Sequence, residues 1–136
     1  MNSSLVDMKE RPSGERMAKC IEMLFLELGS SCPIIDSRNY GGGNEALYVR
    51  GGREDEWCWV NIIEWPPGQS ISDGYPYSCS IESRGDDLFS AIVVSAIASM
   101  FGGQVYDDAG YLYPGREFSP NEFRRELLLK IHQKPL

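Results

Sequence analysis

The sequence contains few of the residues that build catalytic or metal centres. Its 136 residues include one histidine, His132, and its four cysteines form no Cys-x-x-Cys pair. A catalytic serine or cysteine usually needs a histidine base, and a zinc site needs clustered Cys and His ligands. We therefore predict no catalytic residue, no cofactor and no metal ligand, and we interpret His132 as a cation near a helix C-terminus.

Long apolar runs are also missing. The longest uncharged apolar stretch, 88–101, is shorter than the about 20 residues that span a bilayer, so we expect no membrane segment. The first ten residues have neither a basic nor an apolar region of the kind found in signal peptides. We therefore expect a cytoplasmic protein whose cysteines are buried, reduced thiols: Cys20, Cys32, Cys58 and Cys79.

Positive charge is in the minority. Lys and Arg number 13 against 20 Asp and Glu, which gives a formal net charge of −7. Non-specific nucleic-acid binding depends on Lys and Arg contacts to phosphates, so this balance argues against it. A basic protein or a small molecule is the expected partner.

The pattern of apolar residues predicts three helices. The first begins at Ser13 as N-cap and ends before Gly29, with its apolar side chains three and four residues apart. The second follows Asp86 as N-cap and is apolar nearly all round up to Gly102. The third begins at Ser119, where Ser-Pro-Asn-Glu forms a capping box with proline at the first helical position.

Strands are expected between these helices. The predicted ranges are 32–36, 46–50, 57–64, 77–84 and 104–106, with a further short strand possible at 111–113. The order α-β-β-β-β-α-β-(β)-α predicts an α+β fold, a mainly antiparallel sheet of four to six strands with helices on one face. We expect residues 1–11 to be a flexible N-terminus and residues 12–136 to form a single domain; the sequence leaves the oligomeric state open.

Two short motifs have more than one interpretation. Gly41 to Ala46 matches G-x-G-x-x-A, but a strand is predicted to follow it, so a flexible hairpin turn is favoured over a nucleotide site. The pairs Asp86–Asp87 and Asp107–Asp108 could meet on one rim of the sheet, as a cation site or a general acid/base pair. Helix capping and turn formation explain the same residues.

Acidic charge is concentrated in one part of the chain. Residues 54–113 contain ten acidic side chains and one basic one, Arg84, whereas the rest of the chain has a net charge of +2. Aromatic rings in the same segment could anchor a cationic partner that the carboxylates attract. The predicted partner-binding residues are Glu54, Asp55, Glu56, Trp65, Asp73, Tyr75, Asp107, Asp108, Tyr111 and Tyr113.

A resemblance to a known class of proteins covers residues 80–123. It consists of Ser80–Asp87 before the apolar helix, Phe101–Asp108 after it, and Ser119–Phe123 at the start of the last helix. This stretch resembles small immunity proteins of bacterial polymorphic-toxin and contact-dependent inhibition systems. The resemblance implies a single cytosolic α+β domain, often acidic, that binds and blocks a toxin domain delivered by a neighbouring cell.

These observations lead to one functional hypothesis and two alternatives. The first is a non-enzymatic immunity protein that covers a cognate toxin domain with a basic surface. The second is a small metabolic enzyme or ligand-binding domain that uses its carboxylates with a divalent cation. The third is a structural or assembly module of a secretion or phage apparatus.

Overall fold

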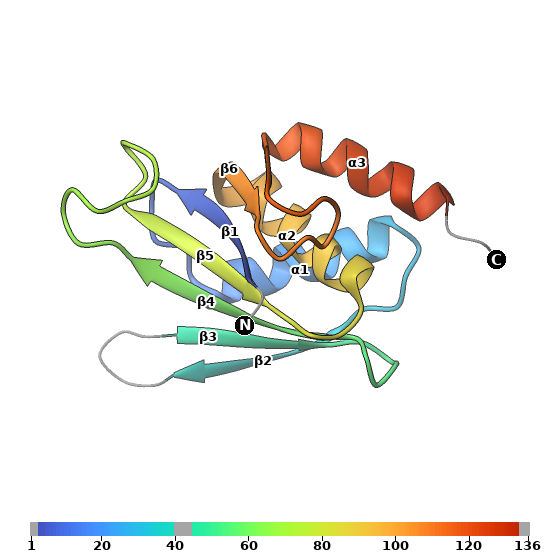
Figure 1. Ribbon diagram of the computed structural model, residues 1–136. Coiled ribbons are helices and arrows are strands. Elements are labelled where there is room, and N and C mark those ends of the chain that lie inside the picture. Colours follow the sequence, from blue (N-terminus) through green and yellow to red (C-terminus); the bar gives the residue numbers. More distant parts are fainter. Residues whose placement is uncertain (1–2, 40–44, 134–136) are drawn as a thin grey trace.

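A computed structural model describes residues 3–39 and 45–133 of the chain (Figure 1). Seven antiparallel strands form one sheet in the order β2-β3-β4-β5-β1-β6-β7. The strands are β1 (Ser3–Met8), β2 (Ile34–Asn39), β3 (Glu45–Arg50), β4 (Trp57–Glu64), β5 (Tyr77–Glu82), β6 (Gly102–Asp107) and β7 (Arg116–Phe118). The predicted α+β fold is thus confirmed, with seven strands where four to six were expected.

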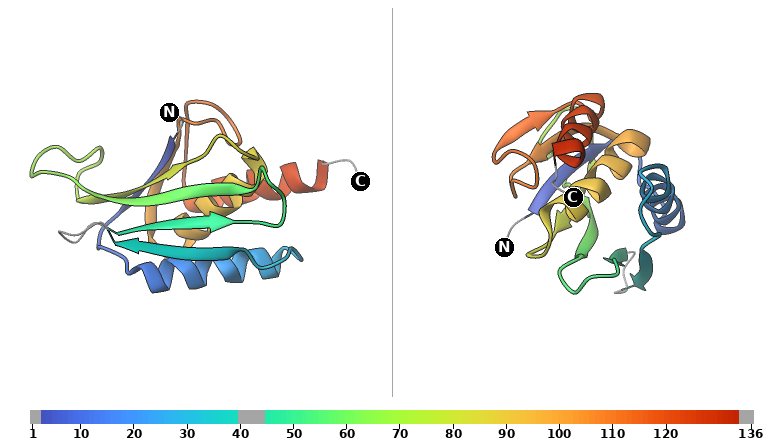
Figure 2. Two further views of the ribbon diagram at one scale, coloured as in Figure 1. Left: turned by 90° about the horizontal axis from the view of Figure 1, so that it is seen from below. Right: turned by 90° about the vertical axis from the view of Figure 1, so that its right-hand side faces the viewer.

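Three helices lie on one side of this sheet: α1 (Gly14–Glu27), α2 (Asp87–Phe101) and α3 (Pro120–Gln133). In the end-on view of Figure 2 the sheet curves around α2, and α1 and α3 lie on either side of that helix. All residues of α2 from Phe89 to Ala98 are buried. Its apolar surface on every side is therefore covered, by the sheet on one side and by two helices on the others.

The predicted helix boundaries are confirmed by their caps. Ser13 accepts a hydrogen bond from the Arg16 backbone N–H, and Gly29 adopts the positive φ (74°) that suits glycine after a helix end. Asp86 caps α2 by accepting from the Phe89 N–H at 2.8 Å. In α3, Ser119 and Glu122 exchange the two hydrogen bonds of a capping box.

The N-terminal segment differs from its prediction. Residues 3–8 are not flexible, because they form β1 in the interior of the sheet, paired with β5 on one side and β6 on the other. Val6 and Met8 are fully buried. The segment looks polar in the sequence because it contains Ser4 and Asp7. Both polar side chains are nevertheless buried: Ser4 donates to Asp107, and Asp7 accepts from Ser78.

Smaller differences concern the strand ends. The first predicted strand, 32–36, lies two to three residues later as β2, and the fourth strand ends at Glu82. Residues 111–113 form no strand; their backbone N–H groups turn inward to a carboxylate, and β7 begins at Arg116. The Gly41–Gly43 turn lies outside the described residues.

The other face of the sheet carries aromatic and polar side chains. Tyr48 on β3 and Trp59 on β4 are paired across the two strands, with ring centroids 4.6 Å apart. Toward β1 the β4–β5 loop (65–76) covers part of this face, and Trp65 donates to Ser78 at 2.8 Å. No helix in the described part of the chain is both long and apolar enough to cross a membrane.

Candidate functional site

The predicted partner-binding residues lie at two opposite ends of the sheet. Glu54–Glu56 lie in the β3–β4 turn, and Asp107–Tyr113 run from the last residue of β6 into the loop before β7. Both segments lie at the end of the sheet where β5 leads into α2. We call this end of the sheet the acidic end. The β4–β5 loop, with Trp65, Asp73 and Tyr75, lies at the other end, the loop end. The ten residues therefore do not form one surface.

Asp107 is a structural residue and is not available to a partner. Its side chain is fully buried and accepts hydrogen bonds from the Ser4 hydroxyl at 2.7 Å and from three backbone N–H groups at 2.9–3.1 Å. Those three N–H groups belong to Tyr111, Leu112 and Tyr113. One carboxylate therefore shapes the loop between β6 and β7, whereas its neighbour Asp108 is exposed.

The two tyrosines of this loop also serve the fold. Tyr111 is buried, and its hydroxyl donates to the Ile81 carbonyl at 2.8 Å; burial raises the pKa of this phenol. Tyr113 is half-buried, and its ring lies 4.9 Å from the Lys130 ammonium and 5.2 Å from the Arg116 guanidinium. Tyr113 is thus already in contact with two cations of the protein itself.

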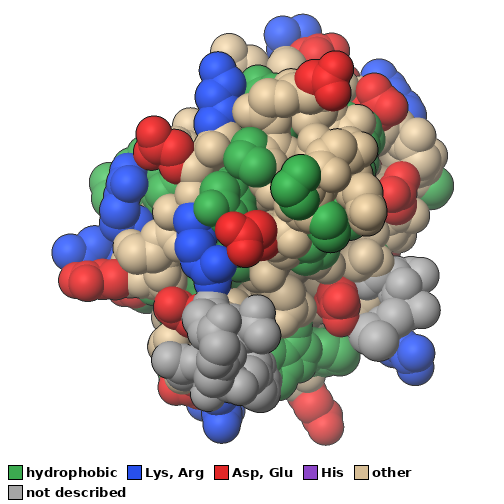
Figure 3. All heavy atoms as spheres, turned by 90° about the vertical axis from the view of Figure 1, so that its left-hand side faces the viewer, with side chains coloured by type: hydrophobic (Ala, Val, Ile, Leu, Met, Phe, Trp, Pro, Cys, Tyr) green, Lys and Arg blue, Asp and Glu red, His purple; other side chains and the backbone are tan. Residues whose placement is uncertain are grey.

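At the loop end the predicted aromatic anchors are already engaged. Trp65 is half-buried and bonded to Ser78, and Tyr75 packs against Gly103, with the Lys9 ammonium 5.7 Å from its ring. Asp73 is exposed. Figure 3 faces this end and shows basic and acidic side chains intermingled with apolar ones. The loop end is therefore of mixed charge.

The acidic end contains a hollow of about 590 Å³, which we call the acidic hollow. Asp55 from the β3–β4 turn and Asp86 and Asp87 from the start of α2 supply its carboxylates. Its other lining residues are Gly85, Leu88, Tyr111, Leu112, Lys130 and Gln133. The two turns are joined directly, since the Asp86 N–H donates to the Asp55 carbonyl at 2.6 Å.

Charge in the acidic hollow is only partly balanced. The Arg53 guanidinium lies 3.4 Å from carboxylate oxygens of both Asp55 and Asp86. Burial raises the pKa of the Asp87 carboxyl, and the negative charges of Asp86 and Asp107 raise it further. A raised carboxyl pKa means that the ionised form is disfavoured here, and an added cation would relieve this.

Asp86 and Asp87 were absent from the predicted partner-binding residues. Their sequence signal was visible, but helix capping accounted for it, and Asp86 does cap α2. Capping uses only one oxygen of Asp86 and leaves the Asp87 side chain exposed at the rim. The capping role of Asp86 therefore leaves its other oxygen and the whole Asp87 carboxylate for other contacts.

The pairs Asp86–Asp87 and Asp107–Asp108 do lie at the same end of the sheet, as a cation site or a general acid/base pair would require. However, Asp107 gives both of its oxygens to the loop between β6 and β7. Within residues 3–39 and 45–133, no group of three or more His, Cys, Asp or Glu side chains is arranged to hold a metal ion.

The cysteines are free thiols, but they are not all buried as predicted. Cys58 and Cys79 lie in the core, Cys20 is half-buried, and Cys32 is exposed beyond the end of α1. Cys32 follows the helix terminus in a connecting segment, so no element covers it.

Comparison with known proteins identifies no relative. No protein-family model matches the chain, and no curated protein or solved structure is detectably similar to it. The fold and the acidic hollow thus define an α+β protein with a carboxylate-lined surface hollow, and function is inferred from that geometry.

Proposed function

We propose that this protein binds a basic protein partner at its acidic end and acts as an immunity protein that covers a toxin domain. The observation that carries the proposal is the acidic hollow, where Asp55, Asp86 and Asp87 meet around about 590 Å³. The resemblance of residues 80–123 to immunity proteins supports it, since this range includes the start of α2.

The acidic hollow suits an arginine or lysine side chain of the partner. Leu88 and Tyr111 in its lining can contact the side-chain stem, and the carboxylates of the lining, which outnumber the Lys130 ammonium, attract its charged end. Partial burial and the nearby charges of Asp86 and Asp107 raise the pKa of Asp87, and a cation placed beside it would offset both effects. The hollow thus favours a cationic group over a neutral one.

The charge of the whole chain supports fast association. Its formal net charge of −7, with the three carboxylates of the acidic hollow and the exposed Glu54 at one end, attracts a basic partner before contact. Electrostatic steering of this kind raises the association rate and weakens as salt screens the charges. Inhibition then follows from covering the partner, which requires no chemistry.

The test measures binding kinetics with a candidate basic toxin domain by surface plasmon resonance, at about 0.02 M and about 0.15 M salt. The double variant Asp55→Asn/Asp87→Asn removes two charges from the acidic hollow. We expect its association rate at low salt to fall about tenfold, and the rate of the unmodified protein to fall with added salt.

The matched control is Glu64→Gln/Asp73→Asn, which removes two exposed carboxylates at the loop end. It changes the net charge equally, so we expect an association rate within about twofold of the unmodified protein. Melting curves show whether each variant is folded. Equal effects of both pairs, or rates independent of salt, would remove the acidic hollow as the interface.

A further inference from the structure

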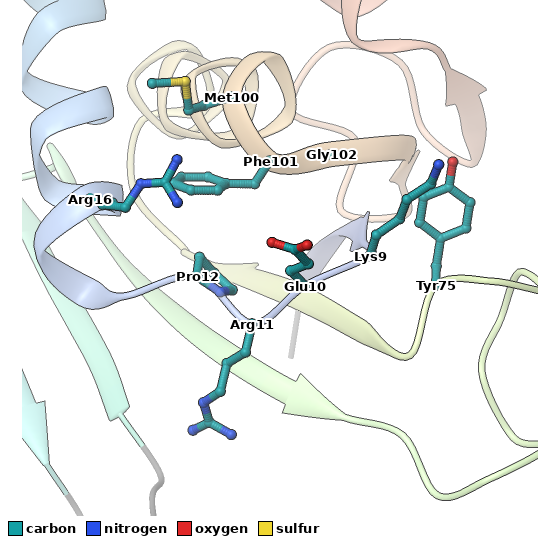
Figure 4. A pocket seen from close by; sticks show the side chains of 9 residues that line it. All are labelled: Lys9, Glu10, Arg11, Pro12, Arg16, Tyr75, Met100, Phe101 and Gly102. Carbon is teal, nitrogen blue, oxygen red and sulfur yellow. The ribbon is translucent and has the colours of Figure 1, made fainter.

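A second hollow of about 410 Å³ lies at the loop end, where β1 leads into α1 beside the end of α2 (Figure 4). We call it the basic hollow. Three of its lining residues are basic and one is acidic, in a chain whose net charge is negative. It is lined by Lys9, Glu10, Arg11, Pro12, Arg16, Tyr75, Met100, Phe101 and Gly102.

Two of these cations are held against aromatic rings. The Arg16 guanidinium lies 5.0 Å from the centre of the Phe101 ring, and the Lys9 ammonium lies 5.7 Å from that of Tyr75. Figure 4 shows them on opposite sides of the basic hollow, whereas Arg11 points away from it. A ring contact positions a cation but leaves its N–H groups able to donate to an anion.

Neither cation is used in the ion pairs of the described residues. Those pairs involve Lys19, Arg53 and Arg124. Glu10 projects between Phe101 and Lys9 in Figure 4, so its carboxylate is the negative charge nearest to the space that an anion would enter. The two positive charges of Lys9 and Arg16 outnumber the one negative charge of Glu10, so the hollow still favours binding of an anion.

We propose that the basic hollow binds a small phosphorylated molecule of about mononucleotide size. Its volume falls within the range of about 300–1,000 Å³ that is usual for small-molecule sites. The phosphate binds the Arg16 guanidinium beside Phe101, because paired guanidinium N–H donors suit phosphate oxygens, and Lys9 adds positive charge from the opposite side of the hollow. The remainder of the ligand rests on the apolar surface of Met100 and Phe101.

The test uses isothermal titration calorimetry and NMR with adenosine monophosphate, adenosine and inorganic phosphate as probes. We expect the monophosphate to bind and to shift the resonances of Lys9, Arg16 and Gly102. Adenosine lacks the charged group and should bind at least about tenfold more weakly. Inorganic phosphate should shift the same residues with lower affinity.

Three variants make the test specific. Arg16→Gln should weaken monophosphate binding about tenfold, and Glu10→Gln should strengthen it, since it removes the opposing charge. Lys19→Gln is the matched control: it lies on the same helix, also removes one positive charge, and is outside the basic hollow. It should change the affinity by less than about twofold.

Several results would overturn the proposal. One is the absence of binding by both the monophosphate and phosphate up to about 10 mM. Another is an equal loss of affinity in Arg16→Gln and Lys19→Gln, which would indicate attraction by overall charge alone. Melting curves check folding, and Lys9→Gln replaces Arg16→Gln if that variant is unfolded. None of these readouts uses a protein partner, so the outcome is independent of the proposal for the acidic hollow.

Discussion

At the scale of single residues, Asp107 and Asp108 show how position decides the role of a carboxylate. Asp107 is the last residue of β6 and its side chain accepts from four donors, whereas Asp108, the next residue, is exposed to solvent. A partner-binding role was predicted for each of them. The structure leaves only Asp108 with an accessible carboxylate.

Replacing Asp107 with alanine should destabilise the protein strongly. The change leaves the Ser4 hydroxyl and three backbone N–H groups without their acceptor in a buried site. Because an unsatisfied buried donor is costly, we expect a loss of about 3 kcal/mol or more in the free energy of unfolding. Urea denaturation measures this loss. Asp108→Ala is the control and should stay within about 0.5 kcal/mol; a similar small loss for Asp107→Ala would contradict the assignment.

The pKa of Asp87 should lie above the ordinary value of an aspartate. Burial and the neighbouring charges of Asp86 and Asp107 raise its pKa, so the folded state takes up this proton more readily than the unfolded state. The stabilising contribution of Asp87 is therefore present at low pH and is lost as the pH rises through the raised pKa.

NMR titration of the Asp87 carboxyl tests this directly. Asp86→Asn should lower the pKa of Asp87, because asparagine keeps the N-cap but removes the charge. The free energy of unfolding of Asp87→Asn, relative to that of the unmodified protein, should rise as the pH is raised from about 3 to about 7. An Asp87 pKa at or below the ordinary value would contradict the environment described for the acidic hollow.

At the scale of elements, β1 joins the two parts of the sheet. It pairs with β5 and β6, both of which lie far along the chain from it, and Val6 and Met8 face α2 and the core. Without β1, both neighbouring strands lose a row of hydrogen bonds and the core opens on one side. An element of six residues thus links four strands on one side to two strands on the other.

Removing residues 1–8 should therefore abolish cooperative folding. We expect the shortened chain to lose its melting transition by circular dichroism and the dispersion of its NMR spectrum. A milder variant, Val6→Ala, should lose about 2 kcal/mol through the cavity that it leaves in the core. Lys9→Ala lies just beyond the strand on an exposed residue and should change stability by less than about 0.5 kcal/mol. A cooperative transition in the shortened chain would show that β1 is dispensable.

At the scale of the whole molecule, the two hollows lie at opposite ends of one sheet. Carboxylates from two turns line the acidic hollow, whereas Lys9 and Arg16 line the basic hollow. This arrangement separates charge along the molecule. The proposed basic partner and the proposed anion would therefore occupy separate ends of the molecule.

The four thiols should report on the packing of the whole molecule. Cys32 is exposed, Cys20 is half-buried, and Cys58 and Cys79 lie in the core. Burial also raises the pKa of Cys58 and raises that of Cys79 to about 12, which suppresses their reactive thiolates.

In the native protein a thiol reagent should therefore modify Cys32 first and Cys20 more slowly. Cys58 and Cys79 should react at least about a thousandfold more slowly, because the reagent reaches them only when the protein unfolds globally. Mass spectrometry after timed alkylation measures these rates, and denaturant should make all four thiols reactive. Rapid native modification of Cys58 or Cys79 would contradict the packed core.

The sequence alone determined the helices and much of the sheet. Ser13, Asp86 and Ser119 mark helix starts because a cap acts on N–H groups two or three residues away. The alternation of apolar and polar residues in β5 is likewise a property of adjacent residues. Local interactions of this kind leave a local pattern, so they can be predicted without knowing the fold.

Only the tertiary structure decided which residues share a surface. β1 has partners more than 70 residues away, and nothing within its own six residues distinguishes buried Ser4 and Asp7 from exposed polar residues. The acidic hollow likewise joins Asp55 to Asp87 through the meeting of two turns. Such contacts depend on the order of strands in the sheet, because hydrogen bonding between distant segments brings the turns together and decides which side chains lose water.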